Sequence, residues 1–371
     1  MPKLGTFCIA ALAALFLSVP AMAGKTKNVI LVISDGVRWQ EVFTGADPTL
    51  LNDKAGGSWT PVPELKQRFW SDDVEARRKL LFPFLWGTIG TEGQIFGNQH
   101  AGSIARVTNP MWFSYTGYNE MSSGVADPKI DSNEFGPNPN VTVFEWLNTL
   151  PDLAGQVEIF GTWQTFADIF NVKRSKLPIR AGASLVDATD HSPRGQLLLE
   201  LYQTTTRLEL ADPFDSFLHV SLRDHLKTHH PRVLFVGYGD TDTWQHVGRY
   251  DAFLETAHSF DAFVGDLWNQ VQSIPEYKDS TTLIISTDHG RGGGLVEWKE
   301  HGTKEKGSNN IWIAVIGPDT PALGERHHVH QVTQSQIAST VAAFLGKDFR
   351  AYKPAAAPSL IEALAPPVAS H

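Results

Sequence analysis

The stretch Leu283-Ile284-Ile285-Ser286-Thr287-Asp288-His289-Gly290 sets an apolar run directly before an acid and a histidine. Two other apolar runs lead to acids in the same way: residues 234–238 precede Asp242, and residues 29–33 precede Asp35. Short apolar runs rich in β-branched residues and bounded by turn residues are typical of buried parallel strands. Because the carboxyl ends of parallel strands meet at one edge of a sheet, we expect these acids to converge there.

The rest of the chain alternates between strand-like and helix-like patterns. Strands are predicted at residues 27–33, 156–160, 233–236, 281–286 and 310–316, and helices at 63–81, 142–150, 194–210, 213–228, 249–271 and 331–345. This alternation predicts an α/β fold with a mainly parallel central sheet and helices on both faces. We expect one catalytic domain over residues 24–350 with an irregular insertion near 45–102 over the active face. The Ala/Pro-rich tail, residues 351–371, is expected to be an extended surface segment.

The first 23 residues have the pattern of a secretory signal peptide. Lys3 supplies a positive start, residues 7–19 are apolar, and Ala21-Met22-Ala23 predicts cleavage after Ala23. The apolar stretch is too short to span a bilayer comfortably, and we expect no membrane span elsewhere. The sequence therefore predicts a periplasmic or secreted protein. The single cysteine, Cys8, lies inside this segment, so the mature chain is expected to use neither disulfides nor thiolate chemistry.

The charge balance of the chain argues against nucleic acid as a partner. The formal net charge is −9, and loss of Lys3 with the signal segment makes it −9 − 1 = −10. An acidic surface repels polyanions. Bound metal ions would invert the local sign, so a small phosphorylated substrate is compatible with this balance.

Histidines accompany the acids at the predicted strand ends. His246 follows Asp242 with three residues between them, His289 follows Asp288 directly, and His301 lies just ahead of the strand 310–316. Carboxylate oxygen together with imidazole nitrogen suits zinc best, with manganese or iron as alternatives. Two such ions roughly 4 Å apart are the usual machinery for in-line displacement at phosphorus. The pattern therefore predicts a two-metal hydrolase.

The chain resembles the alkaline phosphatase superfamily, in the branch of the nucleotide pyrophosphatases/phosphodiesterases. The motifs that carry the resemblance extend over most of the chain: Ile33-Ser34-Asp35-Gly36, Thr108-Asn109-Pro110 with Thr116-Gly117, Asp242-x-x-x-His246, Thr287-Asp288-His289-Gly290 and His301-Gly302. The resemblance implies an alkaline phosphatase-like fold with two zinc ions at the carboxyl ends of the strands. It implies one ion held by Asp242, His246 and His301, and another held by Asp35, Asp288, His289 and the nucleophile oxygen.

The resemblance also points to a hydroxyl nucleophile at the start of a helix. Thr108 best matches the Thr-x-Pro pattern and is the predicted nucleophile and metal ligand. The interval from Thr108 to Gly117 is one residue shorter than the family pattern, which leaves Ser114 and Thr116 as alternatives. Without the resemblance, Thr108 would be interpreted as a helix N-cap.

Asn133 occupies the place where relatives carry an asparagine that contacts the phosphoryl group, with Asn119 and Asn138 as alternatives. Together these features predict an exported two-metal hydrolase of phosphoric esters, either diesters or monoesters, that forms a covalent phospho-enzyme on Thr108. The alternatives are a sulfatase or phosphonate hydrolase of the same superfamily, or a metal- or phosphate-binding protein without catalysis.

Overall fold

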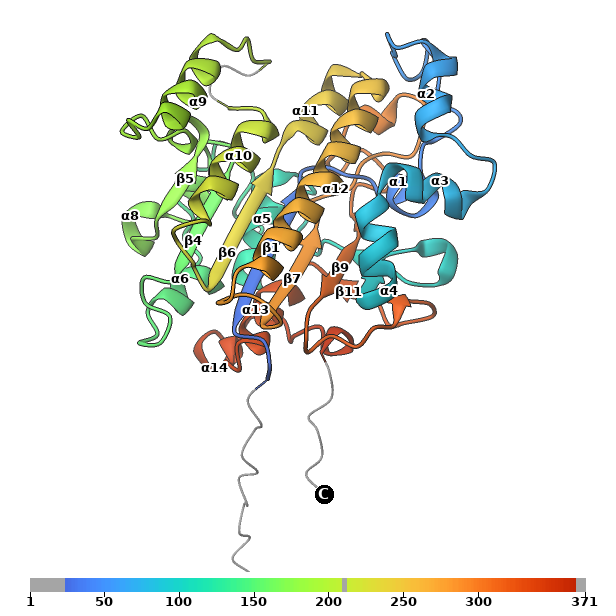
Figure 1. Ribbon diagram of the computed structural model, residues 1–371. Helices are drawn as coiled ribbons and strands as arrows, with labels where there is room; N and C mark the ends of the chain where they lie inside the picture. The colour runs from blue at the N-terminus through green and yellow to red at the C-terminus, as the bar shows by residue number, and fades with distance from the viewer. Residues whose placement is uncertain (1–23, 209–211, 365–371) are drawn as a thin grey trace, which may run out of the picture.

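The computed structural model describes residues 24–208 and 212–364 (Figure 1). The predicted signal segment, residues 1–23, lies outside these residues. A twisted sheet runs through the centre of the molecule with helices on both of its faces (Figure 1). In the described ranges, no helix is both long enough and apolar enough to cross a bilayer.

The central sheet has eight strands in the order β10-β2-β9-β7-β1-β6-β4-β5. Their bounds are β1 Asn28–Ser34, β2 Gln94–Phe96, β4 Val157–Gly161, β5 Ile179–Ala181, β6 Val233–Tyr238, β7 Thr281–Ser286, β9 Ile313–Ile316 and β10 Gly324–Glu325. Neighbours from β7 through β5 pair in parallel, whereas β9 is antiparallel to both β7 and β2. A small second sheet joins β11 (Val332–Thr333), β3 (Ala105–Arg106) and β8 (Asn310–Ile311).

Strand β1 shows why the sheet is buried on both faces. Side chains of a strand alternate between its two sides. Val29, Leu31 and Ile33 lie in one hydrophobic core, and Ile30 and Val32 lie in the other. An all-apolar strand of this kind fits only where helices cover both faces, which is the reason for the central position of β1.

Each face of the sheet has its own helices. The first core takes side chains from α1 (Trp39–Thr44), α2 (Val62–Phe69), α3 (Val74–Leu81), α10 (Asp215–His225) and α12 (Tyr250–Ser273). The second takes side chains from α5 (Ser114–Ser123), α6 (Val143–Asn148), α7 (Phe166–Ile169), α13 (Gln336–Phe344) and α14 (Phe349–Tyr352). Figure 1 shows α10 and α12 in front of the sheet and α5 behind it. The remaining helical segments are α4 Gly90–Glu92, α8 Val172–Ser175, α9 Pro193–Thr204, α11 Asp240–Val247 and the single turns η1 Leu85–Ile89, η2 Gln99–Ala101, η3 Gly182–Leu185, η4 Glu297–Lys299 and η5 Ile361–Ala363.

Two expectations from the sequence were only partly right. The segment 45–102 is more regular than expected: the helix predicted at 63–81 is present as α2 and α3, and the segment also contributes β2 to the central sheet. The described part of the tail runs along the surface as expected, but it also packs inward, since Ala356, Leu360 and Ala363 are buried in the second core. In both cases the apolar positions are too widely spaced to show a period, and contacts with distant elements order them.

Candidate active site

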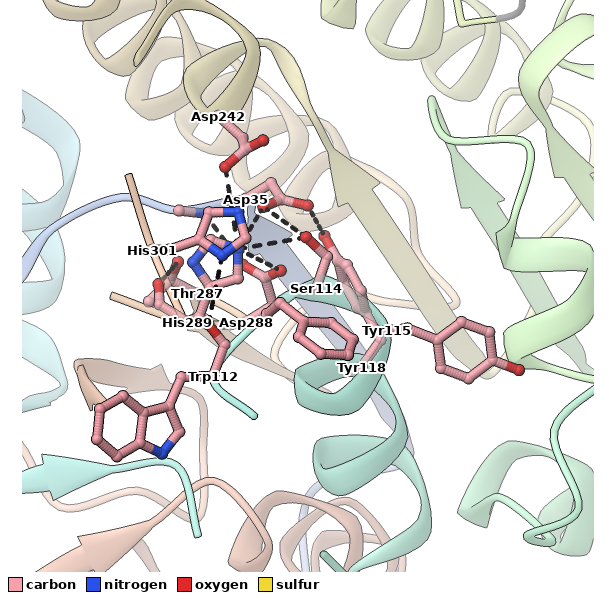
Figure 2. A network of polar contacts seen from close by, with 12 residues as sticks. Asp35, Trp112, Ser114, Tyr115, Tyr118, Asp242, Thr287, Asp288, His289 and His301 are labelled. Carbon is pink, nitrogen blue, oxygen red and sulfur yellow. Dashed lines mark hydrogen bonds and ion pairs between the residues drawn. The ribbon is translucent and has the colours of Figure 1, made fainter. Parts of the chain in front are cut away.

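The strand register brings the predicted acids to one edge of the sheet. Ile33 of β1 pairs with Ser286 of β7. Asp35 and Asp288 each follow this pair by two residues, so they leave the sheet side by side. Strand β6 ends beside β1 at the same edge and leads into α11, which carries Asp242 on its first turn. This edge is where ligands bind in open α/β sheets. Figure 2 shows these side chains gathered at the ends of the strands.

Asp35, Asp288 and His289 form a buried group. Nε2 of His289 lies 3.3 Å from Oδ1 of Asp35 and 3.4 Å from Oδ2 of Asp288. His289 and Asp288 have no exposed surface, and Asp35 is 7% exposed. Oδ1 of Asp288 accepts a hydrogen bond from the backbone N–H of Gly36, and Oδ2 of Asp35 accepts one from the Tyr118 hydroxyl. These bonds fix how both carboxylates face the imidazole.

Asp242, His246 and His301 form a second, more open group. Oδ2 of Asp242 lies 3.4 Å from Nε2 of His246, which lies 3.1 Å from Nε2 of His301. The two groups touch where Nε2 of His289 lies 3.9 Å from Oδ1 of Asp242. The guanidinium of Arg291, which is buried behind this group, forms an ion pair with Asp242.

The charged groups strongly affect one another's protonation. Burial and the neighbouring Asp35 carboxylate raise the pKa of Asp288 to about 8. Burial disfavours a charged imidazole, but the adjacent Asp288 and Asp35 carboxylates raise the pKa of His289 to about 9. Burial, with repulsion from His289, holds the pKa of His301 well below its ordinary value. His301 is therefore neutral, which is the form that can bind a metal ion.

The residues present fit two divalent cations. In each group, ligand atoms from all three residues lie within 4.8 Å of one another. Oδ2 of Asp288 is buried without a hydrogen-bond donor, which is costly unless a cation compensates it. The facing Nε2 atoms of His246 and His301 offer a second place for a cation. Mixed oxygen and nitrogen donors of this kind suit zinc.

Ser114, and not Thr108, lies beside the buried group. Its Oγ is 3.2 Å from Nε2 of His289 and 3.5 Å from Oδ1 of Asp35 (Figure 2). Ser114 is the first residue of α5, and Gly117 lets this helix approach the site, because a Cβ there would lie 2.2 Å from the carbonyl oxygen of Asp288.

The hydroxyl of Thr108 has a different partner. It donates a hydrogen bond of 2.7 Å to the buried carboxylate of Glu120, as does the backbone N–H of Thr108. The structure thus places the predicted nucleophile in a structural contact. Thr116 is also committed elsewhere, since its hydroxyl donates to the carbonyl oxygen of Phe113.

A cavity of about 430 Å³ opens onto the site. Asn133 lines it, and its Oδ1 accepts a hydrogen bond from the backbone N–H of Tyr115 on the first turn of α5. Asn119 and Asn138 bond each other away from this cavity. The cavity is lined by Asp35, Ser114, Asn133, Glu134, Thr162, Trp163, Thr165, Leu208, Asp212, Pro213, Phe214, Gly239, Asp240, Asp242, Thr243, His246 and His301.

Sequence reasoning missed the residues that support the ligands from behind. Tyr118 bonds Asp35, Arg291 pairs with Asp242, and Glu120 holds the loop before Ser114. Tyr118 and Glu120 lie on α5 at intervals of four and six from Ser114, so a helical projection from Ser114 would have put Tyr118 beneath it. No local signal marks Arg291 as buried.

The comparisons with known proteins rest on structure alone. No family model and no curated protein sequence matches the chain. Among solved structures, a 2-O GAG sulfatase matches with a TM-score of 0.54 at 13% identity over 93% of this chain and 76% of its own. The lipoteichoic acid synthase of Listeria monocytogenes matches with 0.53 at 11% over 88% and 73%. A phosphonate monoester hydrolase from Silicibacter pomeroyi matches with 0.52 at 12% over 93% and 78%.

These three proteins have different substrates but share one architecture. The matches extend over 88–93% of this chain and 73–78% of the solved chains. At such low identity the matches show the fold alone. The resemblance to the nucleotide pyrophosphatase/phosphodiesterase branch stays a prediction. The chain therefore shares its α/β fold with these three solved structures, and its place in the alkaline phosphatase superfamily stays a prediction.

Proposed function

We propose that this protein is a metal-dependent hydrolase of phosphoric esters with Ser114 as its nucleophile. The observation that carries the proposal is the position of the Ser114 Oγ, 3.2 Å from His289 and 3.5 Å from Asp35 at the N-terminus of α5. This replaces Thr108, whose hydroxyl is bonded to Glu120.

The chain supplies its own groups for each part of the reaction. The Ser114 Oγ attacks phosphorus in line, the P–O bond to the leaving group breaks, the proton lost by Ser114 ends on the leaving-group oxygen, and a covalent phosphoserine forms. Water then hydrolyses this intermediate and releases phosphate with the serine restored. The backbone N–H groups on the first turn of α5 favour the negative phosphoryl oxygens. Asn133 accepts from one of those N–H groups with its Oδ1, which leaves its amide N–H₂ to donate to substrate.

Asp242, His246 and His301 would hold one divalent ion, and Asp35, Asp288, His289 and the Ser114 Oγ would hold the other; the mixed oxygen and nitrogen donors of both groups suit zinc best. When bound, such ions neutralise charge on phosphoryl oxygens and lower the pKa of a coordinated hydroxyl. His289 and the carboxylates then orient Ser114 toward the cavity.

A rate panel on zinc-loaded protein tests the proposal. Aryl phosphate, aryl phosphodiester, aryl phosphonate and aryl sulfate are compared before and after chelation. We expect turnover of a phosphoric ester that chelation abolishes and zinc restores. Full activity after exhaustive removal of metal would contradict the proposal, and so would a protein that turns over none of the four.

Sulfate ester hydrolysis is the second candidate, because a sulfatase has the same fold. The sequence around Ser114 reads Ser-Tyr-Thr-Gly-Tyr and lacks the Pro-x-Arg that marks many modified sulfatase nucleophiles. Aryl sulfate turnover above that of every phosphorus ester in the panel would favour this candidate.

A further inference from the structure

The loop between β3 and α5 is held in an unusual conformation just before Ser114. Trp112 has φ +59°, which residues other than glycine rarely adopt. Oδ1 of Asn109 accepts hydrogen bonds from the backbone N–H groups of Met111 at 3.1 Å and Trp112 at 2.9 Å. This side chain, which is 1% exposed, therefore sets the turn that places Trp112.

A buried carboxylate anchors the same turn. Glu120 has no exposed surface and lies on α5, the helix that Ser114 begins. Its two oxygens accept from the backbone N–H and the amide of Asn109 at 2.8 and 2.9 Å, and from the backbone N–H and hydroxyl of Thr108. The backbone N–H of Ser335 also donates to it. With five donors, this carboxylate ties the loop to the helix.

The turn ends on a contact with the candidate metal centre. The carbonyl oxygen of Trp112 lies 3.3 Å from Nδ1 of His301. A carbonyl oxygen can only accept, so this hydrogen bond requires a proton on Nδ1, and the ring that binds a cation through Nε2 is then the tautomer protonated at Nδ1. Nε2 of His301 is then unprotonated and faces Nε2 of His246 at 3.1 Å. A carbonyl behind a histidine is the usual means of orienting a ligand to a metal ion.

We propose that Asn109 and Glu120 form a buried positioning unit that sets the tautomer of His301 through the Trp112 carbonyl. The same unit holds the loop from which Ser114 emerges. The inference rests on the proposed function, because it gives the unit a role in ion binding by Asp242, His246 and His301. Asn109, the middle residue of the Thr-x-Pro motif, thus orients a ligand of the site without contacting the site itself.

Asn109→Ala tests the unit by removing the acceptor for Met111 and Trp112. Zinc is titrated into metal-free protein against a chromophoric chelator. The parent should bind two ions, and the variant should bind one as tightly and the other about 10- to 100-fold more weakly. His301→Ala is the reference for loss at the affected group. Asn109→Ser, whose hydroxyl accepts the same bonds more weakly, should give an intermediate loss and serves if Asn109→Ala does not fold.

Asn138→Ala is the matched control for the loss of a buried amide. Asn138 is fully buried and donates to Asn119 and to the Ile169 carbonyl, with no link to His301. It should leave the ratio of the two zinc affinities unchanged. Suppose that the parent binds two zinc ions and that Asn109→Ala weakens the binding of both equally, or of neither. The unit would then be structural only, and the inference would be overturned.

A second readout needs no metal. Nitrogen-15 NMR of metal-free parent should show His301 protonated at Nδ1, and Asn109→Ala should populate the other tautomer. Failure of the parent to bind zinc while this tautomer shift occurs would reject the proposed function and keep the positioning unit. A parent His301 protonated at Nε2 would reject the unit whatever the zinc titration shows.

Discussion

Two hydroxyl groups six residues apart have opposite surroundings. Ser114 lies beside an imidazole and a carboxylate at the mouth of a cavity, whereas Thr108 donates to a carboxylate that four other groups also bond. A hydroxyl that already donates to a buried acid contributes to stability. One that faces a cation-binding group and a cavity is placed to attack a substrate.

Ser114→Ala should therefore lower turnover of the preferred phosphoric ester by several orders of magnitude, on the order of the loss of a nucleophile elsewhere. Zinc content should stay at the parent value, because Asp35, Asp288 and His289 remain. Steady-state rates and metal analysis measure the two effects.

The matched variant is Thr108→Val, which keeps the shape and removes the bond to Glu120. It should cost about 1–3 kcal/mol in the free energy of unfolding and retain most of the turnover. An inactive Thr108→Val beside an active Ser114→Ala would restore Thr108 as the nucleophile.

Elements of this fold are joined by buried acids as well as by apolar packing. Asp261 on α12 accepts from the backbone N–H groups of Phe84 at 2.6 Å and Leu85 at 2.9 Å, where η1 begins. Burial outweighs these bonds and raises the pKa of Asp261 from 3.8 to about 7. The junction between α12 and η1 therefore prefers a protonated acid.

Stability should depend on pH at this junction. The contribution of Asp261 to the free energy of unfolding is fully present below pH 3.8 and is lost as the pH rises through about 7. Asparagine does not titrate, so the stability of the parent relative to Asp261→Asn should fall by about 2–4 kcal/mol between pH 4 and 7.5. Denaturant unfolding at several pH values measures this difference. Glu64→Gln, at an exposed position on α2, controls for the loss of one negative charge, and an equal slope in both variants would contradict the assignment.

At the scale of the whole molecule, the cavity adds its own charge to an acidic chain. Glu134 lines it together with the rings of Trp163 and Phe214, and none of the described lining residues is lysine or arginine. The net charge of the chain is −9. Aromatic walls beside acids favour an uncharged or positively charged leaving group and disfavour an anionic one.

An aryl phosphate with an uncharged ring should thus have a higher kcat/KM than its carboxylated analogue, by about 10-fold at low salt. Added salt should narrow the difference through screening. Glu134→Gln should narrow it as well, with little change for the uncharged ring. Equal rates for both substrates at low salt would show that the lining does not select by charge.

Local pattern was sufficient for the inner strands β1, β4, β6 and β7 and for the acids that follow β1, β6 and β7, but not for the short strands β2, β5 and β10 of the same sheet. Asp35 and Asp288 follow runs whose residues are apolar throughout, and such runs can be buried only as inner strands of a covered sheet. The spacing of Asp242 and His246 is likewise local, because four residues on a helix bring both side chains to one face. The structure brings these residues together with His289 and His301 at one edge.

Only the tertiary structure decided which hydroxyl faces the site. Thr108 lies in the loop that leads to Ser114 at the start of α5, and the roles of the two residues depend on Glu120, on the approach that Gly117 allows and on the turn at Trp112. The pairing of β2 within the segment 45–102 and the burial of Ala356, Leu360 and Ala363 depend in the same way on partners far along the chain. Hydrophobic period and short motifs depend only on residues that are near in sequence. Hydrogen bonds across loops and packing against distant helices form only when the whole chain folds, so the local pattern does not contain them.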